Sequence, residues 1–200
     1  MTAPITLGIR LLRLLEANGV DTVFGIPGVH TVELYRGLEA SPIRHVTPRH
    51  EQGAAFMADG YARVSGKPGV CLLITGPGLS NAATPMAQAM ADSVPMLVVT
   101  GVAGAMHRGM GRGTLHELPD QRAFAREVAR MSRTILHADQ LDETLAEAFA
   151  LFETARPGPV HLEIPLDLMA TPASGEAPSV PMLARPVPEP SGIARAAEML

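Results

Sequence analysis

The 200-residue sequence predicts an α/β domain built on a six-stranded parallel sheet flanked by helices. Short apolar runs alternate with segments of helical periodicity, an alternation typical of parallel sheets covered on both faces. Turns that contain Gly and Pro follow several of the apolar runs, as expected where a strand passes into a helix. Hydrophobic residues make up 46% of the chain, which is enough for a sizeable core.

The elements are predicted in order along the chain. A first helix of about three turns carries leucines from Leu7 to Leu15 and stops at Asn18-Gly19, a common C-terminal signal. Strands are expected over residues 22–24, 43–46, 69–74, 96–100, 134–136 and 159–164. Helices are expected around residues 30–38, 51–64, 79–91, 121–129 and 140–154. The long loop 102–120 is rich in Gly, His and Arg, and we expect it to order only against a ligand or partner.

The composition changes near Ala170, so the domain is expected to cover residues 1–170. Prolines recur between Pro172 and Pro190, which predicts an extended Pro-rich linker over residues 171–190. Residues 191–200 have the form of a capped helix start. The sequence therefore has the form of a longer protein truncated just inside a middle domain.

Charge and hydropathy exclude two classes of partner. The net charge is −4, with 16 basic and 20 acidic residues spread along the chain, so no basic stripe is available for nucleic acid. No apolar run approaches the roughly 20 residues that span a membrane, and the N-terminus has no targeting pattern. We therefore expect a cytoplasmic protein.

Cys71, the sole cysteine, lies in an apolar strand and is expected to pack as a small hydrophobic side chain.

Glu51 opens a predicted helix that otherwise shows mainly small or apolar faces. Periodicity places Ala54, Ala55, Ala58 and Ala62 on an inward face, and Asp59 can pair with Arg63 at i,i+4. The simpler interpretation of Glu51 is a first-turn acid that stabilises the helix dipole by about 0.3–1 kcal/mol. The alternative is a partly buried acid that awaits a basic nitrogen on a ligand.

Four blocks carry a resemblance to a known family. They are Gly25-Ile26-Pro27-Gly28, the run from Arg49 to Arg63, Thr75-Gly76-Pro77-Gly78, and Asp92-Ser93-Val94-Pro95. In this order they resemble the N-terminal pyrimidine-binding domain of thiamine-diphosphate enzymes, in the group of acetolactate synthases and 2-oxo acid decarboxylases. The resemblance runs from about Thr6 to Asp167.

The resemblance implies a catalytic role for Glu51. In the family, the matching glutamate hydrogen-bonds a ring nitrogen of the cofactor's aminopyrimidine and promotes its imino tautomer, so that the exocyclic nitrogen can take the proton from the thiazolium carbon. The resemblance also implies that the cofactor pocket is lined by Pro27, Gly28, Thr75, Gly76, Pro77, Gly78, Asn81 and Gln88. The full enzyme would decarboxylate a 2-oxo acid, and then either release an aldehyde or ligate the product to a second carbonyl.

The family holds the diphosphate and its Mg²⁺ in a separate C-terminal domain, through Gly-Asp-Gly followed by Asn. No Gly-Asp-Gly occurs in this chain, so Mg²⁺ is expected only through that other domain. No cluster of His, Cys, Asp and Glu has a metal-binding spacing, and no metal is assigned to these residues. The resemblance also implies a homodimer or homotetramer whose sites are shared between subunits. Ala54, Ala55 and Met57 are then expected at or near the subunit interface instead of wholly in the core.

His30, Leu115 and His116 are the substrate-side candidates. Val29 stands where many acetolactate synthases have a second glycine, and Leu115-His116 replaces their usual aromatic residue and glutamine. These departures favour a decarboxylase or a synthase of altered specificity. The Val29-His30 and His116-Glu117 segments also resemble those of decarboxylases of 5-guanidino-2-oxopentanoate. The guanidinium of that substrate could meet one of three acids, Glu33, Glu117 or Asp120.

Two alternatives come from other classes. Gly78-Leu79-Ser80-Asn81-Ala82 nearly matches the nucleophile elbow of a serine hydrolase, although Ala82 replaces the final glycine. Possible triad partners are Asp92, Asp120, His116, His137 and His161. A non-catalytic binding subunit completed by a partner is the other alternative. Gene context, and whether the reading frame continues past Leu200, would distinguish it from an enzyme.

Overall fold

A six-stranded sheet forms the centre of the molecule. The structure is a computed structural model that describes residues 5–180, 183–184 and 186–200. The strands are β2 (Thr22–Gly25), β3 (Arg44–Val46), β4 (Gly69–Leu73), β5 (Met96–Val102), β6 (Met131–Thr134) and β7 (Pro159–Pro165). Their order is β3-β2-β4-β5-β7-β6, and every neighbouring pair is parallel. The predicted fold class is confirmed.

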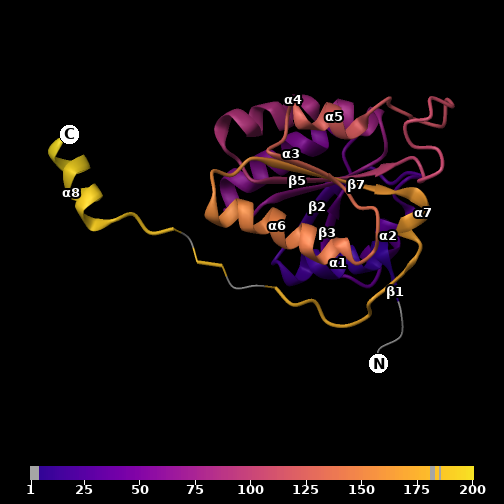
Figure 1. Cartoon of the computed structure of the whole chain (residues 1–200), viewed down its shortest axis with the longest axis horizontal. Coiled ribbons are helices and arrows are strands. Elements are labelled where there is room, and N and C mark those ends of the chain that lie inside the picture. Colours follow the sequence, from indigo (N-terminus) through magenta and orange to yellow (C-terminus); the bar gives the residue numbers. More distant parts are fainter. Residues whose placement is uncertain (1–4, 181–182, 185) are drawn as a thin grey trace.

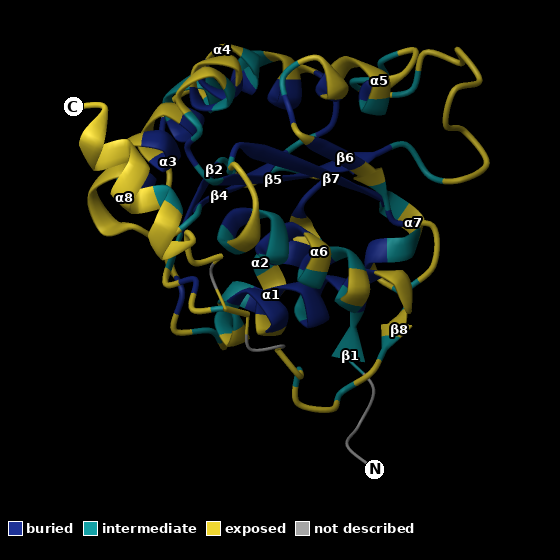
Figure 2. Ribbon diagram, turned by 60° about the vertical axis from the view of Figure 1, so that its left-hand side comes forward, coloured by how far each residue is buried: buried dark blue, intermediate teal, exposed yellow. Residues whose placement is uncertain are grey.

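Helices cover both faces of this sheet, in three layers (Figures 1 and 2). One face is covered by α1 (Leu7–Ala17), α2 (Val32–Leu38) and α6 (Gln140–Thr154). The opposite face is covered by α3 (Glu51–Ser65), α4 (Pro77–Asp92) and α5 (Gln121–Arg126). A short helix, α7 (Leu166–Met169), follows β7 directly.

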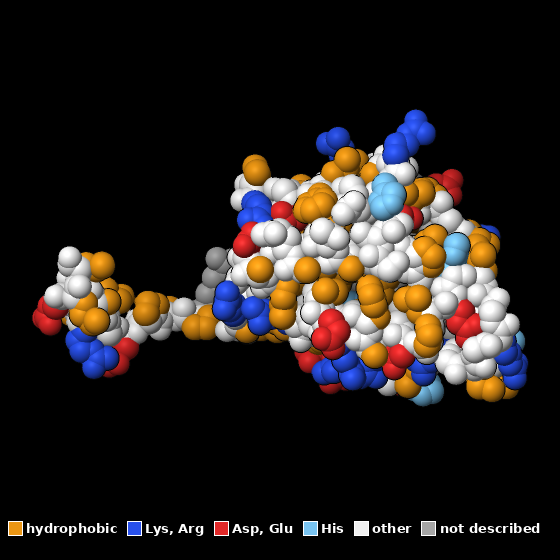
Figure 3. Space-filling view, turned by 90° about the horizontal axis from the view of Figure 1, so that it is seen from above, with side chains coloured by type: hydrophobic (Ala, Val, Ile, Leu, Met, Phe, Trp, Pro, Cys, Tyr) orange, Lys and Arg blue, Asp and Glu red, His pale blue; other side chains and the backbone are white. Residues whose placement is uncertain are grey.

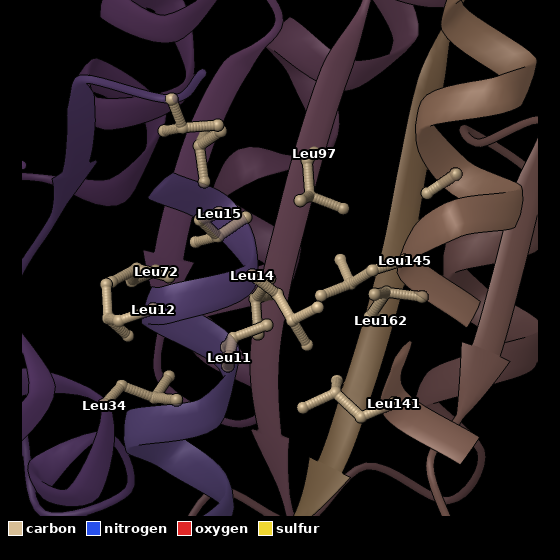
Figure 4. Close-up of a cluster of buried hydrophobic side chains, with 14 of the residues drawn as sticks. Leu11, Leu12, Leu14, Leu15, Leu34, Leu72, Leu97, Leu141, Leu145 and Leu162 are labelled. Atoms are coloured by element: carbon tan, nitrogen blue, oxygen red, sulfur yellow. The ribbon is translucent and has the colours of Figure 1, made fainter. Parts of the chain in front are cut away.

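Alternation along the central strands divides the core into two clusters. Val70 and Leu72 of β4 pack in the cluster of α1 and α6, whereas Cys71 and Leu73 pack in the cluster of α3 and α4. Successive side chains of a strand point to opposite faces of the sheet. Because helices cover both faces here, the side chains on each face are apolar. Figure 4 shows the first cluster, where leucines of α1 meet those of β4, β5, β7 and α6. Cys71 is fully buried, as predicted, and burial raises the pKa of its thiol to about 12.

Strand β6 lies earlier in the chain than predicted. The sequence indicated residues 134–136, but β6 pairs Met131–Thr134 with Val160–Glu163 of β7. β6 is an edge strand, so it can expose a polar side chain such as Arg133 and need not read as an apolar run. Leu136, which we expected inside the strand, is 47% exposed.

Two segments near the domain ends form a small second sheet that the sequence did not predict. β1 (Ile5–Thr6) pairs antiparallel with β8 (Pro172–Ala173). Arg13 of α1 then donates from Nη1 to the carbonyl of Gly175 at 3.1 Å. Chain packing therefore continues past Ala170 into the residues predicted as a linker. Helix α8 (Pro190–Glu198) buries none of its residues and lies apart from the sheet (Figure 1); that residues 191–200 begin a further domain stays a prediction.

Acidic and basic side chains are interspersed on the face shown in Figure 3. Within the described part of the chain, no helix combines the length and apolar character needed to cross a bilayer. A cytoplasmic location stays a prediction.

Candidate functional site

The order of the strands in the sheet indicates where a ligand would bind, at the carboxyl ends of β2 and β4. From β2 the chain passes through α2 to β3, and from β3 it returns through α3, on the opposite face, to β4 on the other side of β2. The connections after β2 and β4 thus leave in opposite directions, and ligands of open α/β sheets bind outside the carboxyl ends of strands at such a switch point. The turns after β2 and β4 should therefore line the site.

The turn after β2 places Gly28 against the turn after β4. A Cβ added to Gly28 would lie 2.7 Å from Cγ2 of Ile74, so only glycine permits this approach. The Oγ1 of Thr31 lies 3.1 Å from both the N–H and the carbonyl of Gly28 and closes the turn. Pro27 is exposed at the start of the turn.

The turn after β4 runs through Thr75, Gly76, Pro77 and Gly78 into α4. Gly76 has a φ of 59°, and a Cβ there would lie 2.0 Å from the carbonyl oxygen of His116. A Cβ added to Gly78 would likewise lie 2.8 Å from Cγ1 of Ile74. Thr75 is 2% exposed, and its Oγ1 has no hydrogen-bond partner among the described residues. This turn brings the loop after β5 down onto the start of α4.

Glu51 lies at the first position of α3 and is half-buried. Asn81 of α4 donates from Nδ2 to Oε2 of Glu51 at 2.9 Å, so the amide fixes one carboxylate oxygen and leaves Oε1 for another partner. His50 caps the helix by accepting the N–H of Gln52 on Nδ1. The structure thus brings Glu51 and Asn81 together at the sheet edge that the two turns define.

The structure does not bring Gln88 to this group. Gln88 is exposed near the far end of α4, where its amide donates to Asp92 at 2.8 Å. Arg63 bonds Asp92 and also pairs with Asp59 at 2.7 Å, the i,i+4 pair that the sequence predicted. Gln88 therefore belongs to the end of α3 and α4 that lies opposite Glu51.

His30, in the turn after β2, contacts His116, in the loop after β5. Their ring centroids lie 5.5 Å apart at an interplanar angle of 85°. His30 is 6% exposed, and burial, with a smaller contribution from His116, lowers its pKa. His116 has a φ of 62°, which is uncommon for a residue with a Cβ. Leu115 is 60% exposed on the same loop. The loop after β5 therefore presents two of the three substrate-side candidates at the site edge, with His30 beneath them.

The sequence did not point to Gln121 and Glu163, two buried residues whose hydrogen bonds hold the turn after β4 in place. Gln121 accepts the N–H of Gly76 at 2.7 Å and donates to Glu163 at 3.1 Å. Glu163 is 2% exposed, and burial raises the pKa of its carboxyl. The available signal was Glu163 itself, because a lone acid inside the apolar strand from Pro159 to Pro165 needs a buried partner.

The acids considered for a guanidinium all have partners within the chain. Glu33 pairs with Arg36 at 3.2 Å, and Asp120 caps α5 by accepting the N–H of Ala123 at 2.8 Å. Both oxygens of Glu117 accept loop N–H groups, from Gly111 and Thr114 at 3.0 Å each. These bonds lower the pKa of Glu117, with the Thr114 backbone the largest cause. The carboxylate of Glu117 thus orders the loop 109–117.

The hydrolase arrangement is not formed. The hydroxyl of Ser80 donates to the carbonyl of Pro77 at 3.2 Å, and within the described residues no histidine bonds it. His161, one proposed partner, is fully buried between Thr100 and Ser132, at 2.9 and 2.8 Å.

The expectation for the alanines of α3 was also wrong in part. Ala54 and Ala55 are fully buried in the core cluster of α3 and α4. Their small side chains let the two helices approach each other closely, and this close approach removes them from solvent. Met57, by contrast, is 45% exposed. Across residues 5–180, 183–184 and 186–200, no three His, Cys, Asp or Glu side chains gather closely enough to hold a metal ion.

A parallel α/β domain with a glutamate and glycine turns at its switch point is typical of proteins that bind a ligand at the carboxyl ends of their strands. The sequence model of the family described as "Thiamine pyrophosphate enzyme, N-terminal TPP binding domain" matches residues 5–124. The chain belongs to this family of thiamine-diphosphate-dependent enzymes.

Individual relatives are similar to this chain to different extents. The chain is 59% identical over 170 residues to the "Probable 2-ketoarginine decarboxylase AruI" of Pseudomonas aeruginosa, covering 85% of this chain and 30% of that protein. It is 42% identical over 159 residues to the acetolactate synthase large subunit of Corynebacterium glutamicum, covering 79% of this chain and 25% of that protein. It is 40% identical over 159 residues to the chloroplastic acetolactate synthase 3 of Brassica napus, covering 79% and 24%. The chain thus spans less than a third of each of these relatives.

Proposed function

We propose that these residues hold the aminopyrimidine end of thiamine diphosphate within a longer enzyme that decarboxylates a 2-oxo acid. The observation that carries the proposal is the pair of Glu51 and Asn81, 2.9 Å apart at the switch-point edge of the sheet. Neighbouring features fit a flat, polar ring: Gly28 leaves the turn without a side chain, and the buried hydroxyl of Thr75 lacks a partner among the described residues.

Glu51 acts in this proposal by exchanging a proton with a ring nitrogen. Asn81 holds Oε2, so the carboxylate cannot turn away and Oε1 is the oxygen that meets the ligand. Half-burial limits competition from water for that contact. When bound, the cofactor would supply a cationic thiazolium ring, an electron sink for the pair of electrons released as carbon dioxide departs.

The 2-oxo acid that we propose is 5-guanidino-2-oxopentanoate, with an aldehyde as product. Identity of 59% to a relative named as a 2-ketoarginine decarboxylase, against 42% and 40% for the two synthases, favours this substrate. Since Glu33, Glu117 and Asp120 are engaged within the chain, we expect the guanidinium to meet an acid from another part of the enzyme. Ligation to a second carbonyl, as the synthase relatives suggest, is the second candidate.

The proposal includes a homodimer or homotetramer with the site shared between subunits, and Mg²⁺ held with the diphosphate by another domain. These residues alone should then bind thiamine diphosphate weakly and without dependence on Mg²⁺. Calorimetry measures this directly, and a tight, Mg²⁺-dependent isotherm would contradict the division of the site.

Glu51→Gln in the full-length enzyme tests the central step. An amide cannot exchange the proton, so turnover should fall by about 10²–10⁴-fold while the fold is retained. Glu143→Gln, an exposed acid on α6, is the matched control, and Ser80→Ala should change little. Full turnover in the Glu51 variant would refute the role assigned to this carboxylate.

A further inference from the structure

A row of buried side chains connects the turn after β4 to the edge strand β6. Gln121 bonds the N–H of Gly76 at 2.7 Å and Oγ1 of Thr100 at 3.0 Å. The same Oγ1 lies 2.9 Å from Nε2 of His161, and Nδ1 of His161 lies 2.8 Å from the hydroxyl of Ser132. All four side chains, those of Gln121, Thr100, His161 and Ser132, are buried. We refer to them as the hydrogen-bond row.

Backbone groups with fixed roles stand at both ends of this row. The N–H of Gly76 can only donate, so Oε1 of Gln121 faces it, and Nε2 of Gln121 donates to the carbonyl of Gly101 at 2.9 Å. At the other end, the carbonyl of Arg122 can only accept, and the hydroxyl of Ser132 donates to it at 3.3 Å. The direction of the hydrogen bonds is therefore set at each end independently.

The fixed ends determine which nitrogen of His161 carries the hydrogen. Thr100 accepts from Nε2 of Gln121, and that amide nitrogen cannot accept in return. Among the described residues, Nε2 of His161 is then the partner that can accept the hydroxyl hydrogen of Thr100. Nδ1 consequently carries the ring hydrogen and donates to Ser132. The opposite tautomer would leave the Thr100 hydroxyl without an acceptor at a fully buried position.

The charged groups near the row do not favour a protonated ring. Glu163 follows His161 by two residues on β7, but its Oε2 accepts from Gln121 at 3.1 Å and its Oε1 from Thr134 at 2.7 Å. Arg108 lies 3.9 Å from the same Oε1. Within the part of the chain that the structure describes, no carboxylate bonds His161. A second ring N–H would also face Thr100 Oγ1, so only the neutral ring satisfies the row.

We propose that His161, as its Nδ1–H tautomer, is a positioning residue for the turn after β4 and acts through Thr100 and Gln121. Nε2 of His161 draws the Thr100 hydroxyl hydrogen away from Gln121, so that Oγ1 offers a lone pair to the Gln121 amide. The amide then keeps Oε1 on the N–H of Gly76. That this turn receives the cofactor rests on the proposed function, and His161 need not touch the cofactor in this role.

NMR of the ¹⁵N-labelled chain tests the tautomer directly. Correlations between the ring protons and ring nitrogens should show a protonated Nδ1 and an unprotonated Nε2 for His161 at neutral pH. The cost of leaving one buried donor unpaired corresponds to an excess of this tautomer of at least about tenfold. A folded chain with the Nε2–H tautomer or an imidazolium at position 161 would overturn the proposal.

Amide exchange at Gly76 tests the action at a distance. His161→Leu should speed exchange of the Gly76 N–H at least about tenfold, because the row loses its acceptor for Thr100. His161→Gln retains an oxygen that can accept there and should restore most of the protection. The N–H of Ile135, bonded to the Glu163 carbonyl at 3.0 Å, reports general loosening of β7. Equal acceleration at Gly76 and Ile135 would mean a merely structural histidine and would overturn the proposal.

A double-variant cycle tests the route through Thr100. Thr100→Val removes the hydroxyl at nearly constant shape and should speed Gly76 exchange as His161→Leu does. In the Thr100→Val background, His161→Leu should add less than about twofold, whereas independent effects would multiply and refute the route. His137→Leu, at an exposed histidine, is the matched control and should leave Gly76 unchanged. If His161→Leu fails to fold, Thr100→Val and the tautomer measurement still decide the question.

Kinetics of the full-length enzyme separate this inference from the proposed function. His161→Leu should raise KM for thiamine diphosphate about tenfold and leave kcat within a few-fold at saturating cofactor, and His161→Gln should restore KM. A response at Gly76 without any change in the cofactor's KM would refute the placement of the cofactor at this turn. Cofactor-dependent decarboxylation without a response at Gly76 would refute the positioning role alone.

Discussion

Oε1 of Gln121 accepts the backbone N–H of Gly76 at 2.7 Å, and this bond ties the start of α5 to the turn that begins α4. The amide of Gln121 donates in turn to Oγ1 of Thr100 at 3.0 Å, to the Gly101 carbonyl at 2.9 Å and to Glu163 at 3.1 Å. One buried side chain thus fixes the turn after β4 to the ends of β5 and β7.

Gln121→Leu should therefore destabilise the fold and misplace the cofactor turn. Each polar group left unpaired costs about 1–3 kcal/mol, and the N–H of Gly76 and the buried carboxyl of Glu163 both lose a partner. Urea unfolding should show the loss, and in the full-length enzyme cofactor affinity should fall as well. Gln121→Glu keeps an acceptor for Gly76 and should preserve that turn better than leucine. Equal stability of the leucine variant and the unaltered protein would contradict this account.

Gly76→Ala should be strongly destabilising. Its φ of 59° is costly for a residue with a Cβ, and that Cβ would lie 2.0 Å from the His116 carbonyl oxygen. We expect a loss of at least about 1–3 kcal/mol in the free energy of unfolding. Gly60→Ala is the control, since Gly60 lies in α3 with open space around it and should gain up to about 1 kcal/mol. Chemical denaturation compares the two, and a tolerated Gly76→Ala would show that the turn is not constrained.

Substitutions on α3 separate core from interface. Ala55→Arg should unfold the domain, because it places a charge in a fully buried position, at a cost of several kcal/mol. Met57→Arg should leave the free energy of unfolding of this chain nearly unchanged, since Met57 is 45% exposed. In the full-length enzyme it should weaken the proposed subunit contact. Light scattering reports the assembly, with Leu136→Arg, at 47% exposure near the opposite edge of the sheet, as control. Unaltered assembly in the Met57 variant would place the interface elsewhere.

Acid should destabilise the fold through His161. Full burial lowers its pKa from 6.5 to about 3, so between these values the unfolded chain binds the proton that the folded chain excludes. Stability from this group is present above pH 6.5 and falls as the pH decreases, by up to about 1.4 kcal/mol per pH unit. Glu163 acts in the opposite direction, because its raised pKa makes the folded state the better proton binder. The variant His161→Gln isolates the histidine effect.

Urea unfolding at pH 6.5 and pH 5 should show that His161→Gln loses less stability than the unaltered protein, by about 2 kcal/mol. His137→Gln, at an exposed histidine, should follow the unaltered protein. A variant at position 161 with the same pH dependence as the unaltered protein would rule out His161 as the titrating group.

The sequence by itself determined the fold class and the position of Glu51 at the start of α3. Periodicity and turn residues are local properties of the chain, so they predict the elements without knowledge of their neighbours. The i,i+4 pair of Asp59 and Arg63 is local in the same sense, and the structure contains it.

Only the tertiary structure decided which distant residues meet. The pair of Glu51 with Asn81, 30 residues apart, and that of Gly76 with Gln121, 45 apart, depend on the order of the strands and the register of the helices above them. Gln88 lies on the same helix as Asn81, but two turns of helix carry it to the end where it bonds Asp92. The position of Ala55 was likewise decided by the tertiary structure. Its small side chain suits both an interface and a helix contact, and only the packing of α4 against α3 shows that it lies in the core.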